Sequence, residues 1–164
     1  MGMCGNYIAV SNDELRQIKD GTTGIYDLCE LSETDGRDIT DIDKAWDMMS
    51  FTFTGETFGM GTSPEYCVVP MLIDQTLERY SDEFNAFYLS EKQVQEVSDY
   101  LSDVDKETLR AKFDHDELVA NEVYAVSEDD AEGDFEYMLE YVFSLKDFYK
   151  KVAEKKQAVI FWIC

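Results

Sequence analysis

The fold of this protein is decided by one stretch of sequence, Asp41-Ile42-Asp43-Lys44-Ala45-Trp46-Asp47-Met48-Met49-Ser50-Phe51-Thr52-Phe53-Thr54-Gly55. Its apolar residues recur at steps of three and four, which places them along one side of an α-helix: Ile42, Ala45, Trp46, Met49 and Phe53. The pattern predicts an amphipathic helix that Thr40 or Asp41 caps and that Gly55 ends. Trp46 is then the structural anchor of this helix in the core.

Four polar residues lie on or beside the opposite face of the predicted helix: Asp43, Lys44, Asp47 and Ser50. Lys44 stands three residues before Asp47, a spacing at which two charged side chains can pair. Asp43 and Asp47 are like charges four residues apart, and such a pair weakens a helix unless a cation or a donor lies between them. Packing does not explain these two aspartates, so the four polar residues form our candidate binding site.

The composition limits the class of protein. The 164 residues include 36 Asp and Glu against 14 Lys and Arg, a formal net charge of -22, and 45% of them are hydrophobic, enough for a sizeable core. Binding to nucleic acid or to an anionic membrane is disfavoured, because phosphate recognition needs clustered cations. The charge favours a basic protein partner or metal cations, although strong acidity often serves only solubility.

The cysteines and the first residues indicate the compartment. Cys4, Cys29, Cys67 and Cys164 are scattered without a Cys-x-x-Cys pair, which suits reduced thiols better than a disulfide framework or a zinc site. The start Met1-Gly2-Met3-Cys4-Gly5 has neither the basic region nor the long apolar run of a signal peptide, and the sequence predicts no membrane span. We therefore predict a cytoplasmic protein with no cofactor and no metal site.

Strand-like and helix-like segments alternate along the chain. Strands are predicted at 6–10, 84–89 and 158–163, and extended segments at 67–73 and 123–126. Helices are predicted at 12–19 and 91–102, each after a capping box, at 105–113 with a continuation to 119, and from 135 to 156. No internal repeat or linker divides the chain, so the pattern favours one α/β domain over residues 1–164.

His115 is the only histidine, and it lies between Asp114 and Asp116. It is a candidate general base or ligand, but no Ser or Cys lies at a motif spacing that would identify a nucleophile. Cys4 or Cys67 would meet His115 only through the fold, which one sequence neither supports nor excludes. The pattern favours a solvent-exposed histidine at a helix end, and cysteines that are small buried hydrophobic residues.

Two further segments suggest ligands, and each has a simpler interpretation. The run Gly55-x-x-x-Gly59-x-Gly61 lacks the Lys-Ser/Thr pair of a phosphate-binding loop and is typical of a connecting loop. The acidic run Glu128 to Asp134 could bind calcium, but it lacks the spacing of an EF-hand. The second pattern favours a solvated loop whose first residues, Ser127 to Asp130, cap the following helix.

Met1-Gly2-Met3, Asp41-Ile42-Asp43-Lys44-x-Trp46 and Thr54-Gly55 together resemble the YfbM-like family of small uncharacterised bacterial proteins, over essentially the whole chain. The resemblance implies an α/β fold, at the boundary with α+β, in which helices and a mixed β-sheet form three layers. It implies no established activity. Many members of the family have a histidine four residues after the tryptophan, where this chain has Ser50, so any chemistry of that histidine would be lost or altered here.

These observations predict a non-enzymatic binding or regulatory protein with a basic protein partner, which binds at Asp43, Lys44, Asp47 and Ser50. A sharper form is an immunity-type protein that neutralises a basic toxin domain, since an acidic surface speeds the encounter with a cationic partner. The alternative is a small hydrolase-type enzyme that uses His115 with a nearby carboxylate or thiol. The geometry around His115 discriminates between the two classes.

Overall fold

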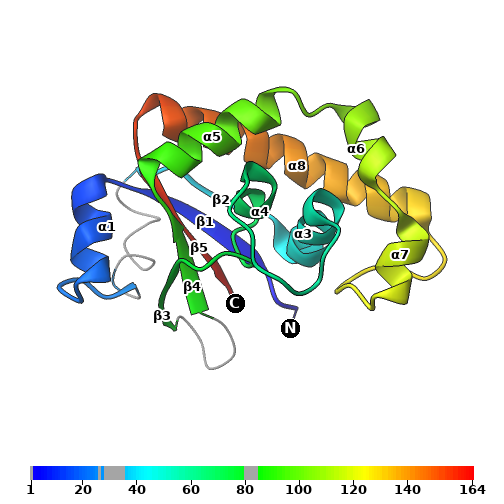
Figure 1. Cartoon of the computed structure of the whole chain (residues 1–164), viewed down its shortest axis with the longest axis horizontal. Helices are drawn as coiled ribbons and strands as arrows, with labels where there is room; N and C mark the ends of the chain where they lie inside the picture. Colours follow the sequence, from blue (N-terminus) through cyan, green and yellow to red (C-terminus); the bar gives the residue numbers. More distant parts are fainter. Residues whose placement is uncertain (1, 26, 28–35, 80–84) are drawn as a thin grey trace.

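The computed structural model describes residues 2–25, 27, 36–79 and 85–164 (Figure 1). Within these residues, five strands form one sheet in the order β2-β1-β5-β4-β3. Their bounds are β1 (Gly5–Val10), β2 (Ile39–Asp41), β3 (Thr76–Arg79), β4 (Asn85–Leu89) and β5 (Ala158–Ile163). The first and the last strand of the chain are neighbours inside this sheet, paired from Gly5↔Ile163 to Val10↔Ala158.

Helices cover both faces of the sheet. On one face α1 (Asn12–Lys19) contributes Leu15 and Ile18 to a small core cluster with Ile8 and Val10 of β1. The larger core cluster, which holds Tyr7 of β1, lies on the other face. Six helices of the described residues pack there: α3 (Trp46–Thr54), α4 (Pro64–Val68), α5 (Glu91–Ser102), α6 (Lys106–Lys112), α7 (His115–Ala120) and α8 (Ala131–Glu154). The predicted three-layer α/β arrangement is confirmed. No helix among the described residues combines the length and the apolar character needed to cross a membrane.

The strand directions correct one part of the expected fold. A mixed sheet was expected, yet the four strand pairings are all antiparallel. The course of α8 explains why β5 is antiparallel to β1. Tyr137, near the start of α8, bonds to Asp43 beside the first residues of β1, whereas Lys155, just after α8, pairs with Asp38 at the far end of β2. The helix therefore runs alongside β1 in the same direction, and a tight turn sends β5 back.

Most of the predicted elements are confirmed. The capping boxes at Ser11 and Ser90 are present, each with reciprocal bonds between the cap and the third helical residue. The predicted strand at 84–89 is β4, although residue 84 lies outside the described residues. Two extended segments were predicted wrongly: residues 123–126 form turns, and residues 64–68 form α4, which overlaps the segment expected at 67–73.

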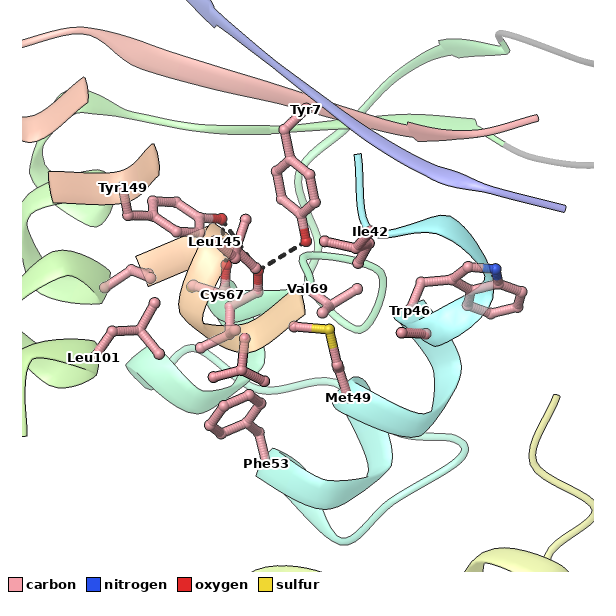
Figure 2. Packing of buried hydrophobic residues seen from close by; sticks show 14 of the residues in the cluster. Tyr7, Ile42, Trp46, Met49, Phe53, Cys67, Val69, Leu101, Leu145 and Tyr149 are labelled. Carbon is pink, nitrogen blue, oxygen red and sulfur yellow. Dashed lines mark hydrogen bonds between the residues drawn. The ribbon is translucent and has the colours of Figure 1, made fainter. Parts of the chain in front are cut away.

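Two buried tyrosines hold the end of α4 in the core (Figure 2). The last carbonyls of a helix have no partner within the helix, and here they lie away from water. Tyr7 Oη donates to the Val68 carbonyl at 3.0 Å, and Tyr149 Oη lies 3.1 Å from the carbonyls of both Cys67 and Val68. Burial raises the pKa of both phenols well above its usual value, so both remain neutral donors.

Removing these hydroxyls will test whether they hold the end of α4 in the core. Tyr7→Phe should cost about 1 kcal/mol, because the Val68 carbonyl keeps the Tyr149 hydroxyl. Tyr149→Phe should cost more, because its single O–H is shared between the Cys67 and Val68 carbonyls and only the Val68 carbonyl has the Tyr7 hydroxyl as well. The double variant should lose more stability than the sum of the single variants, since the Val68 carbonyl then has neither tyrosine hydroxyl. Urea unfolding of all four proteins measures this. Additive or smaller losses would contradict a shared role.

Candidate functional site

The stretch at residues 41–55 begins in the structure as a single 3-10 turn. This turn, η1 (Asp43–Ala45), continues directly into α3, which Gly55 ends with a left-handed φ of 72°. Ile42 occupies the N-cap position of the turn and no side chain caps it, so the predicted cap by Thr40 or Asp41 is wrong. Asp41 still contributes at the start, because its Oδ1 accepts the N–H of Asp43 at 3.1 Å. Asp43 itself has a φ of 43°, a conformation that aspartate adopts more readily than most residues.

The Asp43 carboxylate joins three segments of the chain. Cys4 Sγ, just before β1, donates to Oδ1 at 3.2 Å, and Tyr137 Oη on α8 donates to Oδ2 at 2.8 Å. The tyrosine oxygen in turn accepts the Lys44 N–H at 3.2 Å. Each carboxylate oxygen therefore has a fixed donor, and the orientation of the group is set by the fold.

These contacts shift the three acids in opposite directions. The hydrogen bonds from Tyr137 and then from Cys4 lower the pKa of Asp43 below its usual value. Burial, and after it the Asp43 carboxylate, raises the pKa of both Tyr137 and Cys4. At neutral pH the site is therefore an ionised carboxylate held by two neutral donors.

Further acidic and aromatic residues surround Asp43. Tyr141 lies one helical turn after Tyr137 with a ring-centroid distance of 5.1 Å, and its pKa is raised by burial and then by the charges of Asp43, Asp41 and Glu140. Asp41 and Glu140 are exposed. We call the surface formed by Asp41, Asp43, Tyr137, Glu140 and Tyr141 the Asp43 face.

The four predicted site residues do not share one exposed surface. Lys44 is exposed, and the end of its side chain lies over Gly2. Asp47 accepts the Tyr124 N–H through Oδ2 at 2.8 Å, and the ion pairs of the described residues include none between Lys44 and Asp47. Ser50 is only 3% exposed. The predicted polar side of α3 is thus largely covered, because the chain packs against both sides of this helix.

Trp46 links α3 to the residues before β1. Its side chain is 5% exposed, and its Nε1 donates to the Met3 carbonyl at 2.9 Å. The indole stacks on Tyr124 with a ring-centroid distance of 5.3 Å, and the Tyr124 hydroxyl accepts the Met3 N–H at 3.0 Å. These contacts hold the segment that carries Cys4 next to Asp43.

His115 is largely buried, so the prediction of a solvent-exposed histidine is wrong. Its side chain is 14% exposed, and Nε2 lies 2.8 Å from the Ser127 carbonyl and 3.2 Å from Asp134 Oδ2. A carbonyl oxygen can only accept, so Nε2 carries the proton. Asp134 Oδ2 also accepts the Ser127 N–H at 2.8 Å. The pair ties the start of α7 to the start of α8.

A carboxylate therefore lies within reach of His115, but the two thiols proposed for it are engaged elsewhere. Cys4 bonds to Asp43, and Cys67 is buried at the end of α4, where burial raises its pKa to about 11. The prediction of buried cysteines is correct for Cys67 and wrong for Cys164, which is exposed. Cys29 lies outside the described residues.

The acidic run and the glycine-rich segment have structural roles. Asp130 caps α8 by accepting the Gly133 N–H at 2.9 Å, as predicted for Ser127 to Asp130. Residues 56–63 connect α3 to α4, and Gly61 lies directly against the Tyr66 ring, which leaves no room for a side chain. Within the described ranges, no group of three or more His, Cys, Asp and Glu side chains is arranged to hold a metal ion.

The fold and the site define an α/β domain with an acidic, tyrosine-lined surface. Residues 1–162 match the family described as a domain of unknown function (DUF1877), and the chain belongs to that family. The structure is similar to the crystal structure of YfbM from Escherichia coli, a protein of unknown function, with a TM-score of 0.77 and 20% identity over 98% of this chain and 99% of that one. The resemblance to the YfbM-like family is confirmed. No curated protein sequence matches the chain.

The environment of Asp47 gives a pH-dependent prediction. Burial raises the pKa of Asp47 above its usual value, so the folded state loses stability as the pH rises from the usual pKa through the raised one. Asp47→Asn keeps an acceptor for the Tyr124 N–H and removes the buried charge. The variant should be more stable than the natural protein at pH 7, and the difference should shrink as the pH falls toward 4.

Urea unfolding at several pH values measures this difference. The matched control is Asp147→Asn, which removes the same charge from an exposed position on α8 and should show little such pH dependence. A loss of stability in Asp47→Asn at pH 7 would show instead that the fold uses the charge of Asp47.

Proposed function

We propose that this protein is a non-enzymatic binding protein that engages a basic protein partner through the Asp43 face. The observation that supports this proposal most directly is the fixed, ionised carboxylate of Asp43, with one donor on each oxygen. A carboxylate offers about four acceptor positions, so the Asp43 carboxylate keeps acceptor capacity for an arginine or lysine of a partner. Because Cys4 and Tyr137 already orient the group, little side-chain freedom is lost when it binds.

The residues around Asp43 suit a protein partner. Tyrosine is enriched among the residues that carry most of the energy of protein interfaces, because its ring offers a large rigid surface and its hydroxyl a hydrogen bond. Tyr137 and Tyr141 are half-buried and pack edge to face, so both are held in place. Exposed Asp41 and Glu140 extend the negative charge around them, which favours a cationic surface.

The overall charge supports the same class of partner. A net charge of -22 accelerates the encounter with a cationic protein and disfavours anionic ones. An immunity-type protein that neutralises a basic toxin domain in the cytoplasm is the sharper form of this proposal. The contact between His115 and Asp134 is the observation that favours the hydrolase-type alternative. Nε2, the ring nitrogen in that contact, already donates to the Ser127 carbonyl, so this nitrogen does not serve as a general base.

A comparison of two charge-reversal variants will test the proposal. Asp41→Lys/Glu140→Lys changes the Asp43 face, whereas Asp99→Lys/Glu107→Lys makes the same change in net charge at exposed positions on α5 and α6. Each protein serves as bait in a pull-down from the source cells. The natural protein and the α5–α6 variant should retain the same basic protein, and the Asp43-face variant should lose it.

The association rate of the purified pair supplies the second measurement. It should fall as the salt concentration rises, because screening weakens charge steering. Retention of the basic protein by the Asp43-face variant, or equal loss from both variants, would refute the assignment of the site. A captured protein that carries no basic surface would refute the proposed class of partner.

A further inference from the structure

Cys4 and Cys164 lie opposite each other just beyond the paired ends of β1 and β5. The Cys4 N–H donates to the Cys164 carbonyl at 2.6 Å, and the Cys164 N–H donates to the Cys4 carbonyl at 3.0 Å. Two residues that exchange both bonds form a hydrogen-bonded antiparallel pair, with Cα atoms about 5.5 Å apart and side chains on one face of the sheet. Disulfides span Cα separations of about 4.4–6.8 Å, so the backbone is already within bridging distance.

The two thiols differ in access. Cys164 is exposed, and its sulfur lies 3.3 Å from Asn6 Nδ2, which also donates to the Cys4 carbonyl at 2.9 Å. The Cys164 sulfur is therefore held beside the N-terminal strand. Cys4 is half-buried, and its thiol donates to Asp43. A small disulfide in solution can reach Cys164 first, and Cys4 is placed to react second.

We propose that Cys4 and Cys164 are a reversible thiol pair that glutathione disulfide oxidises to a cross-strand disulfide. In the first step the Cys164 thiol loses its proton to water, and its thiolate attacks glutathione disulfide, forms a mixed disulfide and releases one glutathione thiolate. In the second step Cys4 loses its proton to water, and its thiolate attacks the Cys164 sulfur and displaces the second glutathione thiolate. Both glutathione thiolates take up protons, so the two protein thiols are oxidised and one glutathione disulfide is reduced.

Asp43 controls the second step. Only the thiolate attacks, and the carboxylate that accepts the Cys4 S–H bond favours the protonated thiol. Asp43 therefore slows the attack of Cys4 on the mixed disulfide at Cys164. When the Cys4–Cys164 disulfide forms, Asp43 loses the Cys4 S–H donor. Of its two side-chain donors, Tyr137 Oη then remains.

The geometry also predicts a bond that is easily reduced. Opposite Cβ atoms on antiparallel strands lie about 4.5–5.5 Å apart, whereas a disulfide holds them at about 3.8 Å. Closure therefore draws the two chain segments together at the end of the ladder, one residue pair beyond Gly5↔Ile163. Strained disulfides of this kind are the labile and regulatory ones.

The test uses the whole chain with Cys29→Ser, since Cys29 lies outside the described residues. The protein is incubated in glutathione buffers of increasing oxidised fraction, quenched in acid, alkylated and analysed by peptide mass spectrometry without reduction. We expect a monomeric protein with a Cys4–Cys164 link that reduced glutathione reverses. Cys164→Ser should abolish this link, and Cys67 should stay reduced while the protein is folded.

The rate of closure tests the role of Asp43. The measurement starts from the mixed disulfide on Cys164 and follows formation of the Cys4–Cys164 disulfide. This rate should be severalfold higher in Asp43→Asn than in the natural sequence, whereas Asp147→Asn should leave it unchanged. A mixed disulfide on Cys164 that never closes, or links formed only between chains, would overturn the proposed pair. Equal closure rates in Asp43→Asn and the natural sequence would overturn the role of Asp43.

Discussion

The antiparallel pairing of β1 with β5 is the constraint on which the rest of the structure depends. It joins the first and last strands of the chain over six residue pairs in the middle of the sheet, and every residue of β5 is buried. The chain must cross the length of the sheet before it enters β5, and α8 makes this crossing. Tyr137 reaches Asp43 as a consequence, because α8 starts beside the first residues of β1. The candidate site is therefore built by the topology and not by one local motif.

Polar side chains around the β1–β5 pair have two different roles. In the core, the hydroxyls of Tyr7 and Tyr149 satisfy the last carbonyls of α4 and fix how that helix meets the sheet. Beside the first residues of β1, the Asp43 carboxylate accepts hydrogen bonds from Tyr137 and Cys4 but still lies at the surface. Only the second arrangement leaves charge and acceptor capacity for a partner, which is why we place function there.

The sequence predicted the elements that depend on local signals. The capping boxes at Ser11 and Ser90 and the apolar runs at 6–10 and 158–163 determine their elements within a few residues. The strands β2 and β3 were missed, because they have only three and four residues and lie at the two edges of the sheet.

The site was only partly predictable. Asp43 was selected because packing did not explain it, but its partner Tyr137 is 94 residues away, and the Tyr124 N–H that binds Asp47 is 77 residues away. No local pattern signals such contacts. The burial of Ser50 and of His115 was missed for the same reason, since each depends on distant segments that cover it.

Tyr137 and Cys4 hold Asp43 as an ionised carboxylate between the start of β1 and α8, and the candidate site depends on this arrangement. The most direct test is the pKa of Asp43, measured by carboxyl 13C NMR in the natural protein and in Tyr137→Phe. The structure predicts a pKa below the usual value of 3.8 in the natural protein, and a rise toward that value in the variant, because the largest contribution to the shift is lost. A pKa that is at or above 3.8 in the natural protein, or that is unchanged in Tyr137→Phe, would contradict this account.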